Sequence, residues 1–219
     1  MKPVTRRRSL ASLALAALLA LPGLALADFD EDLAAIQSDW AVANYDIPDK
    51  KAAAAAFESL ADRAHALSEA HPDKAEALVW EGIVLSSWAG KEGGLGALKL
   101  CKQARARLEA AEAIDPSVLQ GSVYTSLGTL YYRVPGWPVG FGNDDKAEAY
   151  LKKALDLNPD GIDPNYFYGD FLAEQGDYAG ARAHLEKALA APDRPGRDLA
   201  DAGRRDEIRA RLEEIAGRS

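Results

Sequence analysis

Apolar and small residues recur along the chain with the spacing of an α-helix, and prolines interrupt the pattern. Three segments share the order Ala-x-Ala-x-Leu-x-x-Ala, at residues 104–111, 147–154 and 181–188. The first alanine, the leucine and the last alanine of each segment fall on one face of a helix. A proline follows each segment, at Pro116, Pro159 and Pro192. Because proline cannot continue helical hydrogen bonding, each helix should end there, and the repetition predicts an all-α repeat protein.

A glycine lies in a second helical pattern upstream of each segment. These glycines are Gly82, Gly128 and Gly169. A glycine inside a helix costs roughly 1 kcal/mol relative to alanine, so three glycines at matching places indicate a packing requirement. The missing side chain would let the glycine helix touch the alanine-leucine helix that follows it. Each repeat is therefore predicted to be an antiparallel helix pair.

Further helices are predicted on both sides of the three repeats. An N-terminal pair is expected within residues 28–74, with helices over about 30–44 and 50–70. The second of these has an apolar side made of Phe57, Leu60, Ala64 and Leu67. Residues 193–219 should form a C-terminal capping helix, because this segment combines an apolar stripe with many charges and so suits an end with one solvated face.

The repeated pattern resembles the tetratricopeptide repeat. The last unit has Gly169, Tyr178, Ala181, Leu185, Ala188 and Leu189 at the family positions, and the middle unit has Tyr124, Leu127, Gly128, Tyr131, Ala147, Leu151, Ala154 and Pro159. The first unit matches less well, since Glu81 stands where the family usually has an apolar residue. The resemblance covers residues 75–192. It implies a right-handed superhelix of antiparallel helix pairs.

The spacing of the repeats departs from the family period of 34 residues. Gly82 and Gly128 are 46 residues apart, and Gly128 and Gly169 are 41 apart. Inserted loops are therefore predicted at 87–101 and 133–145. In the second, glycines and prolines alternate with apolar residues, and such a segment cannot form a helix. Asp145 followed by Glu148 resembles a capping box that opens the next helix.

The second inserted loop carries three apolar side chains, Trp137, Val139 and Phe141. We expect them to be buried, because an exposed set of this kind would lower solubility. They could wall a pocket inside the superhelix, meet a partner surface, or plug the end of the middle pair. Trp137 and Phe141 are therefore candidate contacts of a ligand or partner.

Residues 1–27 have the features of an export signal. A basic start is followed by the uncharged run Leu10–Leu21, and Ala25-Leu26-Ala27 has the pattern of a cleavage site. The run is shorter than the about 20 residues that span a membrane. The sequence predicts a periplasmic or secreted protein without a membrane span after signal removal, exported by the general or the twin-arginine route.

The charge of the chain argues against nucleic-acid partners. The formal net charge is −8, and removal of the signal with its four basic and no acidic residues makes it −12. Such a chain would be repelled by nucleic acid and by anionic lipid heads. Cys101 is the only cysteine, so no internal disulfide can form.

No motif in the sequence indicates catalysis. His65, His71 and His184 do not have the spacing of metal ligands, and phosphate-binding and dinucleotide-binding fingerprints are missing. Only Asp170 and Glu174 form a visible titratable pair. We therefore expect a protein that binds without catalysing, and that uses neither a cofactor nor a metal.

The inner face of the superhelix is the expected binding surface. In the tetratricopeptide family this face comes from the first helix of each pair. The stripe on that helix gives Ser122, Thr125, Thr129, Tyr132 and the adjoining Arg133 in the middle unit, and Asp163, Tyr166, Asp170 and the adjoining Glu174 in the last unit. These residues could hold a small polar or acidic ligand or an extended peptide. The alternative is a solvated helix face.

The second inserted loop, together with residues 158–172, resembles the T component associated with some TRAP-type transporters. The resemblance implies an exported accessory that holds or relays a small ligand with a transporter or solute-binding protein, and that forms homo-oligomers. The alternative is an envelope scaffold whose groove binds a segment of another protein. The partner is then either a small molecule or another envelope protein.

Overall fold

The computed structural model describes residues 29–218, and its regular secondary structure in this range is helical apart from one isolated β-bridge. The helices are α1 (Phe29–Ala41), η1 (Val42–Asp46), α2 (Lys50–Ala70), α3 (Ala75–Glu92), α4 (Gly94–Ile114), α5 (Val118–Arg133), α6 (Asp144–Leu157), α7 (Ile162–Glu174), α8 (Tyr178–Leu189) and α9 (Asp198–Glu214). The predicted export signal lies outside the described residues. Within 29–218 no helix has the length and apolar character that crossing a membrane requires.

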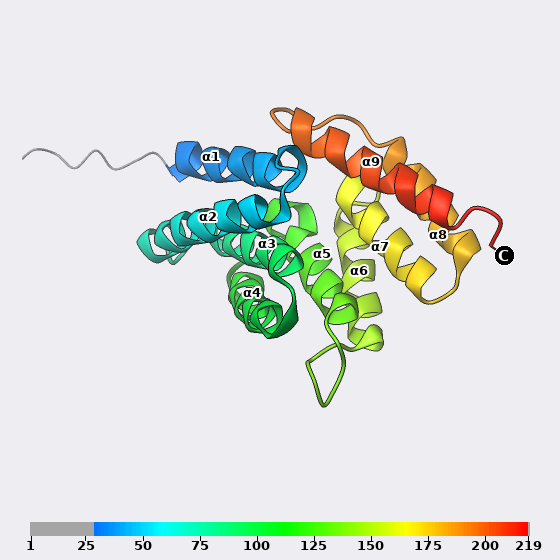
Figure 1. The fold of residues 1–219 in the computed structure, drawn as a ribbon, viewed down its shortest axis with the longest axis horizontal. Coiled ribbons are helices and arrows are strands. Elements are labelled where there is room, and N and C mark those ends of the chain that lie inside the picture. Colours follow the sequence, from blue (N-terminus) through cyan, green and yellow to red (C-terminus); the bar gives the residue numbers. More distant parts are fainter. Residues whose placement is uncertain (1–28, 219) are drawn as a thin grey trace, which may run out of the picture.

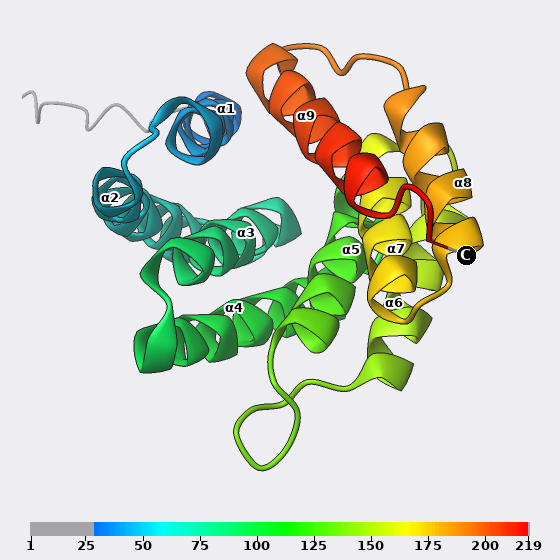
Figure 2. The same cartoon turned by 45° about the vertical axis from the view of Figure 1, so that its right-hand side comes forward.

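The helices form a curved stack of antiparallel pairs, as predicted (Figure 1). The pairs α3/α4, α5/α6 and α7/α8 follow one another, with α1 and α2 at one end and α9 at the other. Figure 2 shows the odd-numbered helices around the inside of the curve and the even-numbered helices on the outside. The prediction of an all-α tetratricopeptide-like fold is confirmed.

The three matched glycines make the close helix–helix contacts that the sequence pattern predicts. A Cβ atom added at Gly128 would lie 2.7 Å from Cγ of Leu151, and one at Gly82 would lie 2.7 Å from Cγ of Leu108. Gly169 repeats the contact with Leu185 at 3.0 Å. The three leucines are fully buried. Each pair is therefore held by a leucine that fills the space its partner glycine leaves free.

Glu81, the departure from the family pattern, joins three helices. Its carboxylate is buried and accepts a hydrogen bond from Ser68 Oγ of α2 at 2.6 Å. Arg107 of α4 lies 3.0 Å away, and His65 of α2 lies 3.1 Å away. Because a buried carboxylate is costly without partners, these three side chains explain how an acid is tolerated at a core position.

The prediction that residues 87–101 form an inserted loop is wrong. Residues 87–101 are helical except at Gly93, because α3 continues to Glu92 and α4 begins at Gly94. Gly93 and Gly94 have φ of +77° and +60°, conformations that glycine adopts without steric cost, so these two residues reverse the chain. Trp88 packs against the core, which explains why α3 continues through the segment. The extra residues lengthen two helices.

The second predicted insertion is a loop over residues 134–143 (Figure 2). The prediction that Asp145 caps the next helix is wrong, because the structure places the cap at Asn143. The Asn143 side chain accepts the backbone N–H of Lys146 at 2.8 Å from an extended conformation. Asn143 also donates its own N–H to Tyr131 O at 2.8 Å, so the loop returns to the helix from which it left.

Candidate functional site

A cavity of about 700 Å³ lies on the inside of the curved stack. Its lining residues come from α1, η1, α3, α5, α7, α9 and two connecting segments, and none comes from α2, α4, α6 or α8. This volume falls within the range of about 300–1,000 Å³ that is common for small-molecule sites. The inner helices therefore border a partly open space that is large enough for a small ligand.

The predicted inner stripe supplies much of the cavity wall. Ser122, Thr125, Thr129, Asp163 and Tyr166 of the predicted stripes line it, and Ile83 and Ser86 of α3 line it as well. The hydroxyl of Thr129 donates to Thr125 O at 2.8 Å, and that of Ser122 donates to Leu119 O at 2.8 Å. Since a hydroxyl oxygen has two lone pairs, these side chains can still accept hydrogen bonds from a ligand.

The start of α5 is strained where it borders the cavity. Leu119 and Gln120 line the cavity with φ of +50° and +54°, and Gly121 follows at +81°. The left-handed region costs a residue other than glycine roughly 1–2 kcal/mol. Strain of this kind concentrates at ligand-binding and active sites, where surrounding contacts maintain it. Its place at the cavity supports a binding role for this wall.

Helix α9, at the C-terminal end of the stack, contacts η1 at the N-terminal end. The ring of Tyr45 in η1 lies against Gly203 of α9, where an added Cβ atom would be 2.3 Å from the ring. The Tyr45 hydroxyl donates to Glu207 of α9 at 3.3 Å. Burial raises the pKa of Tyr45, which keeps the phenol neutral. We call this pair of interactions the closure contact, because it joins the two ends of the stack beside the cavity.

A segment between α8 and α9, residues 190–197, forms another wall and is called the strap below. Arg194 of the strap lies 2.6 Å from Asp163 of α7, and it donates through Nε to the buried Asp201 of α9 at 2.7 Å. Arg204 of α9 also reaches Asp163, at 2.9 Å. Burial alone would raise the pKa of Asp163, but Arg204 and Arg194 lower it to about 2.

The strap ends at Arg197, which crosses to the N-terminal half of the molecule. Its guanidinium lies 4.9 Å from the ring centre of Trp80 in α3 and 5.6 Å from that of Trp40 in α1. All three residues line the cavity. Trp40, Arg197 and Arg204 lie outside the repeats, so the repeat pattern gave no indication of them. The arginine-rich segment 194–211 was the available signal for the strap and α9.

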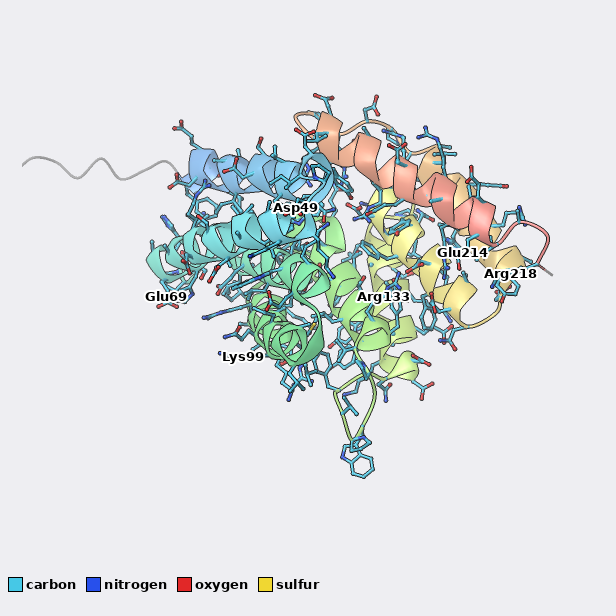
Figure 3. All side chains as sticks on the ribbon, viewed as in Figure 1. Asp49, Glu69, Lys99, Arg133, Glu214 and Arg218 are labelled. Carbon is cyan, nitrogen blue, oxygen red and sulfur yellow. The ribbon has the colours of Figure 1, made fainter. Side chains whose placement is uncertain are left out.

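The remaining polar candidates form a separate cluster that is absent from the cavity lining. Asp170 is 2% exposed and accepts a hydrogen bond from Tyr132 at 2.6 Å. It also pairs with Arg133, which extends from the end of α5 (Figure 3), and lies 3.0 Å from Arg211 of α9. Arg211 reaches Glu174 at 2.6 Å. The cluster joins α5, α7 and α9, and the binding role of its members stays a prediction.

Trp137 and Phe141, the two aromatic candidates of the second loop, lie in different environments. Trp137 is 89% exposed, and the neighbouring Val139 is 62% exposed. The expectation that these side chains are buried is wrong, because the loop closes at its base and projects away from the helices (Figure 1). Phe141 is half-buried, with its ring 5.7 Å from that of Tyr131 and below the guanidinium of Arg105 at 4.3 Å. Neither Trp137 nor Phe141 lines the cavity.

Comparison with known proteins supports the repeat architecture. The sequence model of the tetratricopeptide repeat family matches residues 141–197, which contain α6, α7, α8 and the strap. A comparison with curated proteins produced no match. Within 29–218 no group of three or more histidine, cysteine or acidic residues is arranged to hold a metal ion. The matched repeat and the helical stack are typical of protein-interaction scaffolds.

Proposed function

We propose that this protein is an exported binding protein that holds a small molecule in its cavity. Following the resemblance to the T component, we propose that it works as an accessory that holds or relays this molecule with a transporter or solute-binding protein. The observation that carries the proposal is the closure contact between Tyr45 and Gly203. It ties the two ends of the stack together beside the cavity.

An open tetratricopeptide groove can receive an extended peptide along its inner helices. In this chain, α9 and the strap lie across the inner side, and Arg197 reaches Trp40 and Trp80 on the opposite wall. The remaining volume of about 700 Å³ suits a small ligand better than a peptide segment. Asp163 and Glu207 of the cavity wall are already engaged by arginines, which supports binding over acid–base catalysis.

A second candidate function is that of an envelope scaffold for another protein. Its support is the loop at 134–143, where Trp137 and Val139 are exposed on the same projection. Exposed tryptophans frequently anchor protein interfaces. This surface lies outside the cavity, so the protein could bind a small molecule and a protein partner at separate places, and a second copy of the chain is one such partner.

The test is native mass spectrometry of the mature protein, which reports bound mass and subunit number together. We expect a retained small molecule whose bound fraction falls in Ser126→Phe, because Ser126 lines the cavity and the added ring would occupy part of the space for the ligand. The matched control is Ser59→Phe, at an exposed position of α2, which should keep the bound mass. A mature protein that carries no small molecule, together with a protein partner lost in Trp137→Ala, would support the scaffold instead.

A further inference from the structure

One arginine of the cavity has no anionic partner among residues 29–218. Three arginines line the cavity, Arg194, Arg197 and Arg204. Arg194 and Arg204 each contact Asp163, and each has a second carboxylate. For the Arg197 side chain, the described part of the chain provides neither an ion pair nor a hydrogen bond, only the two indole rings.

The surroundings of Arg197 favour an incoming anion. Burial and the nearby Arg194 lower its pKa, so the protein stabilises this charge less than water would. Its contacts with Trp40 and Trp80 are cation–π contacts, which use none of its N–H donors. A guanidinium presents five such donors in a planar fork that matches a carboxylate.

The same surroundings limit the charge of the ligand. Asp163 and Asp201 also act electrostatically on Arg197, although both contact Arg194 directly. One negative charge at Arg197 would be attracted by a nearby unpaired cation. A second negative charge in the cavity would meet these carboxylates, and the described lining offers no further unpaired cation to neutralise it. The site therefore favours a monoanion over a dianion.

The rest of the wall indicates what the anion is attached to. Apolar side chains from α3, α5 and α7 line the cavity: Ile83, Leu119, Leu130, Ile162 and Phe167. The hydroxyls of Ser122 and Thr129 add a narrower polar wall on α5. We propose that the cavity binds a monocarboxylic acid with an apolar body, and that Arg197 binds its carboxylate. This inference rests on the proposed function, because it names the ligand class of the same cavity.

The experiment compares three probes of equal chain length by isothermal titration calorimetry on the mature protein. Decanoate has one charge, 1-decanol has none and decanedioate has two. We expect decanoate to bind at least about tenfold more tightly than either of the others, as a charge-assisted hydrogen bond to a half-buried guanidinium would provide. Fluorescence offers a second readout, since Trp40 and Trp80 flank Arg197.

Two substitutions in the same part of the chain separate charge recognition from folding. Arg197→Gln should weaken decanoate binding by at least about tenfold and leave 1-decanol binding unchanged. Arg209→Gln is the control, because Arg209 is an exposed arginine of α9 that pairs with Asp206 and does not line the cavity. It should leave the affinity for all three probes unchanged.

The outcomes distinguish this inference from the proposed function. The inference is wrong if decanoate and 1-decanol bind equally tightly, or if Arg197→Gln weakens the binding of both to the same extent. Arg197 then does not recognise the carboxylate, while the small-molecule function stands. Tighter binding of decanedioate than of decanoate would also overturn the inference. If no probe binds and native mass spectrometry finds no retained small molecule, the proposed function fails together with the inference.

Discussion

The repeated core and the closure contact both place a glycine against a large side chain, yet they differ in how firmly they hold. At Gly128, the facing Leu151 is fully buried and belongs to the core of its own pair. At Gly203, the facing side chain is Tyr45, which is half-buried and ends in a hydroxyl bonded to Glu207. The first glycine lies inside a repeat, and the second lies where the two ends of the stack meet.

This difference separates what makes the fold from what makes the site. Buried leucines cannot move without leaving a cavity or a clash, so the repeats should behave as rigid units. The closure contact and the strap instead use aromatic faces, hydroxyls and ion pairs such as that of Arg194 with Asp163. These groups can separate and be solvated, so we expect the part of the molecule that borders the cavity to open more easily than the repeats.

The largest effect is expected in the repeated core, where Gly128→Ala tests rigidity. The new methyl group would meet Leu151 Cγ at 2.7 Å, and the buried leucine has no free space to occupy. Overpacking of this kind costs about 1–3 kcal/mol, which outweighs the helix-propensity gain of alanine. We expect a lower free energy of unfolding in urea denaturation.

The matched control for that substitution is Gly90→Ala in α3. An added Cβ atom at Gly90 has no neighbour within 4 Å, so only the helix-propensity gain applies. It should raise the free energy of unfolding by up to about 1 kcal/mol. Equal stabilisation by both substitutions would show that Leu151 yields, and the contrast between core and closure would disappear.

A smaller effect, of up to about 2 kcal/mol, is expected where the strap meets α7. Arg204 and Arg194 hold the pKa of Asp163 at about 2 against an ordinary value of 3.8. The folded state therefore favours the ionised carboxylate, and this contribution is complete above about pH 4 and is lost as the pH falls toward 2. The glycine–leucine contacts of the repeats carry no such dependence, because they contain no titratable group.

Asp163→Asn provides the measurement for the strap. The variant should be less stable than the parent protein at pH 6, and the gap between their free energies of unfolding should shrink between pH 4 and pH 2. Gly128→Ala should show a gap that does not depend on pH in this range. A constant gap for Asp163→Asn would mean that its ion pairs do not stabilise the folded state.

The repeated core could be predicted from the sequence because its signal is repeated and periodic. Gly82, Gly128 and Gly169 occupy equivalent places, and each partner helix carries the same alanine-leucine pattern. The helix over residues 50–70 was also predicted with its observed bounds. The segment 87–101 was misjudged because a comparison with the family period detects extra residues without indicating whether they extend a helix or form a loop.

The cavity could be predicted only in part. Positions on the inner stripe, such as Thr129 and Tyr166, follow from helix geometry, and they do line the cavity. Arg197 and Trp40 do not belong to a repeated pattern. They come into contact only because the whole stack is curved, and no local pattern of the sequence encodes that curvature. Trp137 was expected to be buried from its apolar character alone, whereas the backbone hydrogen bonds at the base of its loop direct it outward.

The smallest change in stability, and the sharpest test of the contrast, is expected for Gly203→Ala. Its methyl group would lie 2.3 Å from the Tyr45 ring, so the half-buried Tyr45 side chain would have to move away from α9. The helix-propensity gain should offset the lost contact, so the free energy of unfolding should change by less than about 1 kcal/mol. The opening should appear as faster amide hydrogen exchange in η1 and faster release of the bound small molecule, with Gly90→Ala as the control for both rates. A loss of stability as large as that of Gly128→Ala would instead make the closure contact part of the rigid core, and the cavity would need another route of entry.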